Sequence, residues 1–166
     1  MDQPAKSGCA DIFPKALVAE DNANEALQLQ QAFKKARIHA TVHFVSDGME
    51  VVEYLRGKQL FEQVASSTLP GLLVLNLGMP RLSGFGVLEW LRRHPHLRPS
   101  VIVALGNRPE ERTRALALGA DEYIVKQSGS NSAAGLVQAL LQRFRPSTSR
   151  CLPPKVSEEA RLALSP

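Results

Sequence analysis

The fold is decided by a stretch near the middle of the chain, Leu72-Leu73-Val74-Leu75-Asn76, which continues into Leu77-Gly78-Met79-Pro80. Four aliphatic residues in a row are typical of a strand that is buried on both faces. Gly78 and Pro80 do not continue such a strand, because proline has no backbone N–H to give to a sheet. The sequence therefore predicts a central strand that ends in a polar side chain, Asn76.

The same alternation of a short apolar run and a helix-period segment is repeated along the chain. We expect the strands at Lys15–Ala19, Thr41–Val45, Leu72–Leu75, Val101–Leu105 and Glu122–Val125. We expect the helices at 22–37, Met49–Arg56, Gly84–Arg93, 109–118 and Asn131–Phe144. Five strand–helix repeats with apolar strands predict an α/β fold, a doubly wound five-stranded parallel sheet in three layers, α/β/α.

The apolar positions of the first and last helices predict which side chains reach the core. The expected core positions are Ala26, Leu27, Phe33 and Ala36 in the first helix, and Leu136, Val137, Leu140, Leu141 and Phe144 in the last. Gly119 is expected just past the end of the fourth helix, where a left-handed residue often terminates the helix.

The chain has 166 residues, of which 44% are hydrophobic and 22% charged, as in one ordinary globular domain with a tail. We expect an N-terminal tail at 1–14, one domain at 15–145 and a C-terminal extension at 146–166. Proline, serine and threonine mark a linker at the start of the extension. Two alternatives stay open for its remainder: a short helix at Glu158–Leu164, capped by Ser157, that forms a dimer arm, or a disordered segment.

Length and charge also narrow the class of protein. The chain has no apolar run of about eighteen residues that would span a membrane, and charges interrupt its first fifteen residues, unlike a signal peptide. A cytoplasmic location away from membranes is the resulting expectation. The formal net charge is +4, but acids are interleaved with the bases. Such a mixture is typical of a solvated surface, so nucleic-acid binding through the basic tail is the less favoured alternative.

Polar side chains stand at the predicted carboxyl ends of several strands. Glu20 and Asp21 follow the first strand, Asn76 and Gly78 end the third, and Lys126 follows the fifth. In doubly wound sheets, sites form beyond these ends. One such residue alone is more often a solvated cap, but several of them at one edge of a sheet favour a functional site.

Three motifs carry a resemblance to a known family. They are Leu17-Val18-Ala19-Glu20-Asp21-Asn22, Val74-Leu75-Asn76-Leu77-Gly78-Met79-Pro80-Arg81-Leu82-Ser83-Gly84, and Leu118-Gly119-Ala120-Asp121-Glu122-Tyr123-Ile124-Val125-Lys126. In this order and spacing the chain resembles the receiver domains of two-component response regulators, over roughly Ala16 to Phe144. It looks most like the single-domain regulators that accompany bacterial phytochrome kinases. The resemblance implies a flavodoxin-like receiver fold and a role in phosphorelay signalling.

The resemblance also implies roles for the residues at the strand ends. In the family, Glu20, Asp21 and an aspartate at position 76 hold Mg²⁺, together with the carbonyl of Gly78. The aspartate accepts the phosphoryl group from a histidine kinase. A threonine or serine at position 104 and the lysine at position 126 then bind that phosphoryl group.

This sequence departs from the family at the chemistry itself. Asn76 replaces the acceptor aspartate, and a carboxamide is not a nucleophile of the kind that forms an acyl phosphate. Ala104 lacks the hydroxyl, and Gln127 replaces the usual proline after Lys126. We therefore expect a pseudo-receiver with no catalytic residue and no enzymatic activity. Mg²⁺ binding at Glu20, Asp21 and Gly78 should be weak, because one carboxylate is missing while Lys126 remains.

Two other interpretations of Asn76 stay open. In the first, the chain is an ordinary phosphorylatable regulator that carries a mutation at the acceptor site. Ala104 and Gln127 favour natural degeneracy over this interpretation. Alternatively, phosphotransfer goes to another acid such as Asp21, whose position among metal ligands does not suit a nucleophile.

The resemblance also suggests partners: a histidine kinase, for which the phytochrome type is a candidate, and a second copy of the chain. Receivers commonly use the face formed by the fourth helix, fifth strand and fifth helix, which would here include Arg108, Arg112, Tyr123, Leu136 and Leu140. Tyr123 is at the position where family members often turn an aromatic ring on activation. An aromatic side chain that only fills space is the slightly favoured interpretation.

Overall fold

The computed structural model describes residues 15–36, 40–57, 69–126 and 132–143. The expected tail at 1–14 and extension at 146–166 lie outside these residues, as do Phe144 and Gln127. Strands are β1 (Lys15–Ala19), β2 (Thr41–Val45), β3 (Leu72–Asn76), β4 (Val101–Gly106) and β5 (Glu122–Val125). Helices are α1 (Ala23–Lys35), α2 (Gly48–Leu55), α3 (Gly84–Arg93), the 3-10 turn η1 (Pro95–Leu97), α4 (Glu111–Ala117) and α5 (Ser132–Arg143).

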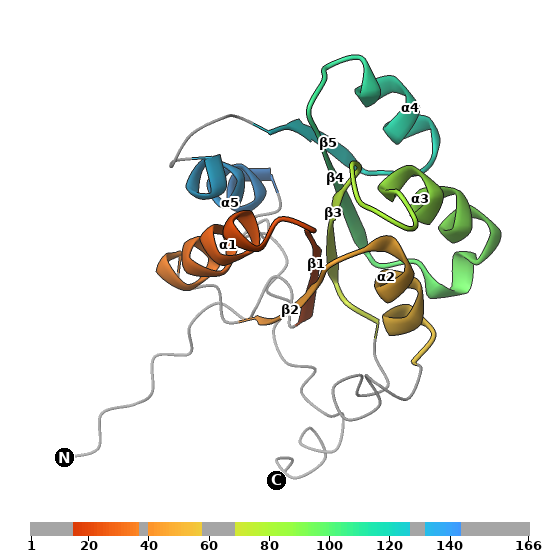
Figure 1. Ribbon diagram of the computed structural model, residues 1–166, viewed down its shortest axis with the longest axis horizontal. Helices are drawn as coiled ribbons and strands as arrows, with labels where there is room; N and C mark the ends of the chain where they lie inside the picture. The colour runs from red at the N-terminus through yellow and green to blue at the C-terminus, as the bar shows by residue number, and fades with distance from the viewer. Residues whose placement is uncertain (1–14, 37–39, 58–68, 127–131, 144–166) are drawn as a thin grey trace, which may run out of the picture.

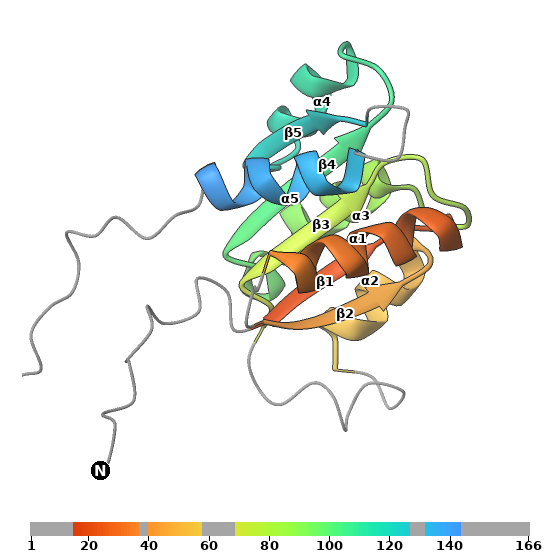
Figure 2. The same ribbon diagram turned by 90° about the vertical axis from the view of Figure 1, so that its left-hand side faces the viewer.

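The five strands form one parallel sheet in the order β2-β1-β3-β4-β5. Helices α1 and α5 lie together on one face, and α2, α3 and α4 cover the other (Figure 1). Figure 2 shows α1 and α5 side by side across the sheet. The predicted α/β fold, a doubly wound parallel sheet in three layers, is therefore confirmed. The chain order changes direction at β1, where β2 lies on one side and β3 on the other, which is where such sheets form their sites.

Strand β3 is the centre of the core. All five of its residues are buried, and their side chains alternate between the two layers, as strand geometry requires. Leu73 and Leu75 pack in the cluster under α2 and α3, whereas Leu72 and Val74 pack in the cluster under α1 and α5. A strand with apolar contacts on both faces is fixed in register, because a shift by one residue would exchange its two faces.

Local sequence signals set the helix ends. The side chains of Asn22, Asp47 and Ser83 accept hydrogen bonds from backbone N–H groups in the first turns of α1, α2 and α3. Gly119 follows the last turn of α4 with a φ of 103°, as predicted for a left-handed helix end. Helix α4 begins at Glu111, later than the expected Pro109, because residues 109 and 110 form a turn before it.

One predicted core residue of α1 is wrong. Leu27 is 52% exposed, and the buried side chains of this helix are Leu29, Ala32 and Phe33. Residues three and four apart share a helix face, whereas residues two apart do not. Because Leu29 faces α5 and the sheet, Leu27 is turned toward solvent. In α5 the predicted positions Leu136, Val137 and Leu140 are buried, and Leu141 packs at their edge.

Over the residues that the structure describes, none of the helices has the length and apolar composition needed to cross a membrane.

Candidate functional site

The carboxyl ends of the inner strands are held together by backbone hydrogen bonds. Leu77 N donates to Leu105 O at 2.8 Å, and Lys126 N donates to Gly106 O at 2.8 Å. A Cβ at Gly84 would lie 2.8 Å from the Cα of Leu77, so only glycine lets α3 begin this close to the end of β3. These contacts fix the end of each strand relative to its neighbour, and with it the first residue of each loop.

Asn76 lies at the middle of this edge and is buried. Its Nδ2 donates to Glu20 Oε1 at 3.1 Å and to Asp21 Oδ1 at 2.8 Å, and its Oδ1 accepts from Gly78 N at 3.2 Å. Two carboxylates accept only, so the amide must present its NH₂ group to them. Glu20, Asp21 and Asn76 are thus brought together at one edge of the sheet, and Gly78 joins them through its N–H.

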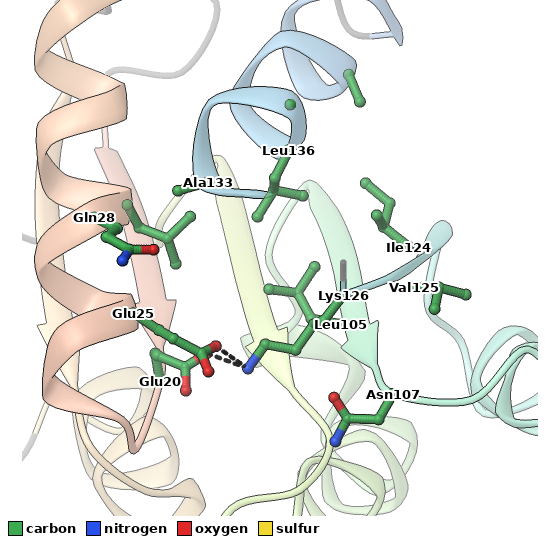
Figure 3. A pocket seen from close by; sticks show the side chains of 13 residues that line it. Glu20, Glu25, Gln28, Leu105, Asn107, Ile124, Val125, Lys126, Ala133 and Leu136 are labelled. Carbon is green, nitrogen blue, oxygen red and sulfur yellow. Dashed lines mark hydrogen bonds and ion pairs between the residues drawn. The ribbon is translucent and has the colours of Figure 1, made fainter. Parts of the chain in front are cut away.

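Lys126 enters the same cluster from the end of β5. Its Nζ lies 2.8 Å from Glu20 Oε2 and 2.5 Å from Glu25 Oε2 (Figure 3). The Glu20 side chain is only 1% exposed, and its two oxygens are satisfied by Lys126, by Asn76 and by the backbone N–H of Asn22. A buried carboxylate requires such pairing, because an unpaired charge in the interior is strongly unfavourable.

Burial and pairing act in opposite directions on these two charges. Burial disfavours the carboxylate and raises the pKa of Glu20, although the hydrogen bond from Lys126 counteracts it. Burial alone would lower the pKa of Lys126, but its hydrogen bonds to Glu20 and Glu25 outweigh this effect and raise it. Lys126 therefore remains an ammonium ion at neutral pH.

Glu25 was not among the residues that the sequence pointed to. It is the third residue of α1, and a glutamate at that position usually serves the helix end, reaching back to the cap. Here it extends instead to Lys126, a residue from the other end of the domain. The only local signal was the spacing Asn22-x-x-Glu25, which does not distinguish the two roles.

A pocket of about 680 Å³ opens beside the cluster, between α1, β5 and α5 (Figure 3). Leu105, Ile124 and Leu136 line its apolar side, and Lys126 with Glu25 stands at its polar end. Residues 127–131 join Lys126 to the start of α5 and lie outside the described part of the chain. The pocket is therefore described by these walls alone.

The oxygens expected to hold a divalent cation are already engaged by N–H donors. Mg²⁺ prefers carboxylate and carbonyl oxygens that are free to coordinate it. Glu20 and Asp21 each accept an N–H from Asn76, and the second oxygen of Glu20 accepts from Lys126. Across the described residues, no three side chains of His, Cys, Asp or Glu converge in a way that could hold a metal ion.

Ala104 and Tyr123 are neighbours in the register of β4 and β5. Both are buried in the cluster under α2 and α3, and Ala104 has no hydroxyl to offer. The hydroxyl of Tyr123 donates to Arg108 O at 2.5 Å and lies 3.2 Å from Glu111 Oε2. Burial and the nearby Glu111 carboxylate raise the pKa of Tyr123. Tyr123 thus packs in the core and also holds the loop between β4 and α4.

The expected docking face must be corrected. Leu136, Leu140 and Tyr123 are 9%, 4% and 4% exposed, so none of them is available to a partner. Arg108 and Arg112 are the exposed members, with side chains 75% and 55% exposed. Leu136 and Leu140 pack inward against the sheet because they share the face of α5 that carries Val137.

A second charged contact, also unexpected from the sequence, fixes the loop after β3. The guanidinium of Arg81 donates to Asp47 Oδ2, the carboxylate that also caps α2. Arg81 is the one non-glycine residue with a positive φ in the described chain, at 59°. The contact ties the loop at 77–83 to the start of α2.

Comparisons with known proteins agree with this architecture. A family model described as "Response regulator receiver domain" matches residues 16–138. The phosphate regulon transcriptional regulatory protein PhoB of Rhizobium meliloti is 34% identical over 137 residues, which are 81% of this chain and 55% of that protein. The chain thus spans about half the length of the curated relatives it matches.

Solved structures extend the likeness over most of the chain. A response regulator in red light signaling of R. palustris is 31% identical, with a TM-score of 0.71, over 82% of this chain and 96% of that one. The phosphorylated cyanobacterial phytochrome response regulator RcpA is 25% identical, with a TM-score of 0.69, over 79% of this chain and 93% of that one.

Proposed function

This chain belongs to the response regulator receiver domain family of two-component signalling, and on that premise we propose that it is a pseudo-receiver, which acts by binding other proteins and accepts no phosphoryl group. Receiver domains interact with histidine kinases, and this one would keep that interaction without the transfer. Its likeness to phytochrome-associated regulators supports a kinase of phytochrome type as the partner.

The observation that carries the proposal is the position of the Asn76 carboxamide. It lies at the end of β3, at the position where the resemblance puts the acceptor aspartate. Its NH₂ group donates hydrogen bonds to the carboxylates of Glu20 and Asp21. The nitrogen lone pair of a carboxamide is delocalised into its carbonyl group, and the carboxamide has no negative charge with which to attack phosphorus. Asp21 accepts a hydrogen bond from the same group, which argues against it as a substitute acceptor.

We also propose that the link between the acceptor position and the expected docking face is altered. With Ala104 in place of a hydroxyl residue, nothing at that position would bond to a phosphoryl group. Tyr123 is buried and its hydroxyl donates to Arg108 O, which supports a ring position that does not depend on phosphorylation. We therefore propose one fixed conformation of the loop between β4 and α4, and a partner affinity that is set by this conformation.

Weak Mg²⁺ binding, absence of enzymatic activity and a cytoplasmic location complete the proposal. Receiver domains bind Mg²⁺ or Mn²⁺ at their acidic site. In this chain the cation would have to displace the N–H donors of Asn76 and Lys126 from Glu20 and Asp21. We also propose a homodimer, with residues 146–166 as the arm.

The first test is intact mass after incubation with acetyl phosphate and Mg²⁺, with an Asn76→Asp variant alongside. We expect no added phosphate on the parent chain. An adduct on the parent would overturn the proposal. If Asn76→Asp gains both a phosphate and a changed oligomeric state, the rival interpretation as an acceptor-site mutant of an ordinary regulator is favoured instead.

Binding gives the second test. The parent chain is titrated with a purified phytochrome-type kinase, with and without ATP, and its mass in solution is measured by light scattering. We expect the same kinase affinity under both conditions, and a dimer that is lost when residues 146–166 are removed. A chain that binds no kinase and forms no dimer at micromolar concentration contradicts a binding role.

A further inference from the structure

The acidic cluster at the strand ends already contains a cation of its own. Glu20 and Glu25 bind the ammonium of Lys126, and Glu20 and Asp21 accept hydrogen bonds from the carboxamide of Asn76. Lys126 is bound by two of them, at 2.8 and 2.5 Å. Figure 3 shows its side chain reaching along the polar end of the pocket to a point between Glu20 and Glu25.

We propose that Lys126 is the resident cation of this site and that Glu25 holds it there, so the ammonium occupies the role that a divalent ion would have. The inference rests on the proposed function, because it presumes a site without an acceptor carboxylate. It goes beyond that function in assigning Glu25 a positioning role. Lys126 becomes a structural cation, and phosphate binding is not its task in this chain.

Burial is the first reason for this role. The Glu20 side chain is 1% exposed, so its charge must be compensated from within the protein. Asn76 and the N–H of Asn22 are neutral donors to one oxygen of Glu20, and Lys126 alone brings a positive charge to the other. Any ion that entered would have to displace a partner that is covalently part of the protein and therefore always present.

Glu25 supplies the second reason. Lys126 is 19% exposed, and its long side chain is free to take other orientations unless a second carboxylate holds it. Glu25 is on the first turn of α1 and reaches across from that helix to Lys126 (Figure 3). The two carboxylates, Glu20 and Glu25, together hold the ammonium at the polar end of the pocket.

The test is Mn²⁺ binding, followed by electron paramagnetic resonance of the free ion, on the full chain. With Lys126→Gln the cluster loses its cation, and we expect Mn²⁺ to bind at least about tenfold more tightly than to the parent. Lys126→Arg keeps the charge and should bind as weakly as the parent. Lys35→Gln removes an equal charge from an exposed position at the far end of α1 and should change nothing.

Adding Glu25→Gln to Lys126→Gln should reduce the gain, because one of the released carboxylates is removed again. Equal Mn²⁺ affinity of the parent and Lys126→Gln would overturn the inference. If, in that case, the parent takes up no phosphate in the mass experiment, only the inference about Lys126 fails and the proposed function stands. Phosphate on the parent, by contrast, defeats the proposed function whatever Mn²⁺ does.

A measurement on Glu25→Gln alone keeps the inference testable if Lys126→Gln does not fold. The ammonium protons of a lysine held by two carboxylates exchange slowly enough to give a ¹⁵N–¹H signal, whereas those of a free lysine do not. We expect this Lys126 signal in the parent and its loss in Glu25→Gln. A signal that persists unchanged in Glu25→Gln would show that Glu25 does not position Lys126.

Discussion

The amide nitrogen of Asn76 lies 2.8 Å from Oδ1 of Asp21, a hydrogen bond between residues 55 positions apart in the sequence. The same nitrogen bonds to Glu20, so one carboxamide connects two acids that would otherwise repel each other. This makes Asn76 a stabilising residue of the fold as well as a departure from the family's chemistry.

Asn76→Asp is accordingly expected to destabilise the protein. The variant loses both N–H donors and places a third carboxylate in a buried cluster, at a cost of about 3 kcal/mol in the free energy of unfolding. Urea unfolding at neutral pH measures the loss. Saturating Mg²⁺ should restore much of it in the variant, because the ion binds the folded state only. The exposed Asn107→Asp is the control, and a variant as stable as the parent without Mg²⁺ would contradict the role of the amide.

The ion pair between Asp47 and Arg81 predicts a dependence of stability on pH. Burial tends to raise the pKa of Asp47, but hydrogen bonds from Glu50 N, Arg81 and Met49 N outweigh it and lower the pKa below the ordinary 3.8. The resulting stability is present above pH 3.8 and is lost as the pH falls through the lower, folded-state pKa.

Asp47→Asn isolates this contribution, since asparagine keeps the oxygen that caps α2. We expect the variant to be less stable than the parent by about 1–3 kcal/mol at pH 7, and the difference to shrink at acid pH. Thermal unfolding at a series of pH values measures it. A difference that stays constant from neutral to acid pH would mean that the charge of Asp47 contributes nothing.

Two leucines give a matched comparison of core and surface. Leu75 is fully buried in β3, whereas Leu27 is 52% exposed on α1. Leu75→Ala should lower the free energy of unfolding by about 2–5 kcal/mol, since it leaves a cavity. Leu27→Ala should change it by less than about 0.5 kcal/mol. Urea unfolding of both variants checks the corrected orientation of α1, which a large loss in Leu27→Ala would refute.

The single tryptophan offers an optical test of the end of α3. Trp90 is stacked on His94, with ring centroids 4.4 Å apart, and the guanidinium of Arg56 lies 5.2 Å from the indole centroid. An imidazole in contact quenches indole emission, so removal of the His94 ring should raise the fluorescence of Trp90.

His94→Gln should raise the emission of Trp90, and His96→Gln should leave it unchanged, because His96 contacts the ring of His94 and not the indole. Equal emission from the parent and His94→Gln would mean that the stacking does not persist in solution.

The sequence by itself determined the architecture. The aliphatic run of β3 and the strand–helix repeats are local signals, and both are confirmed in place. Strand ends in a parallel sheet meet at one edge whatever the side chains are, so Glu20, Asp21, Asn76 and Lys126 could be brought together from sequence alone.

Only the tertiary structure decided what these residues do to one another. The choice of Glu25 as a partner of Lys126, the exposure of Leu27 and the burial of Leu136 and Leu140 depend on how helices rotate as they pack on the sheet. The ion pair of Asp47 with Arg81 depends on how two loops meet. Such contacts join residues far apart in the chain, and local periodicity contains no information on the orientation of side chains across that distance.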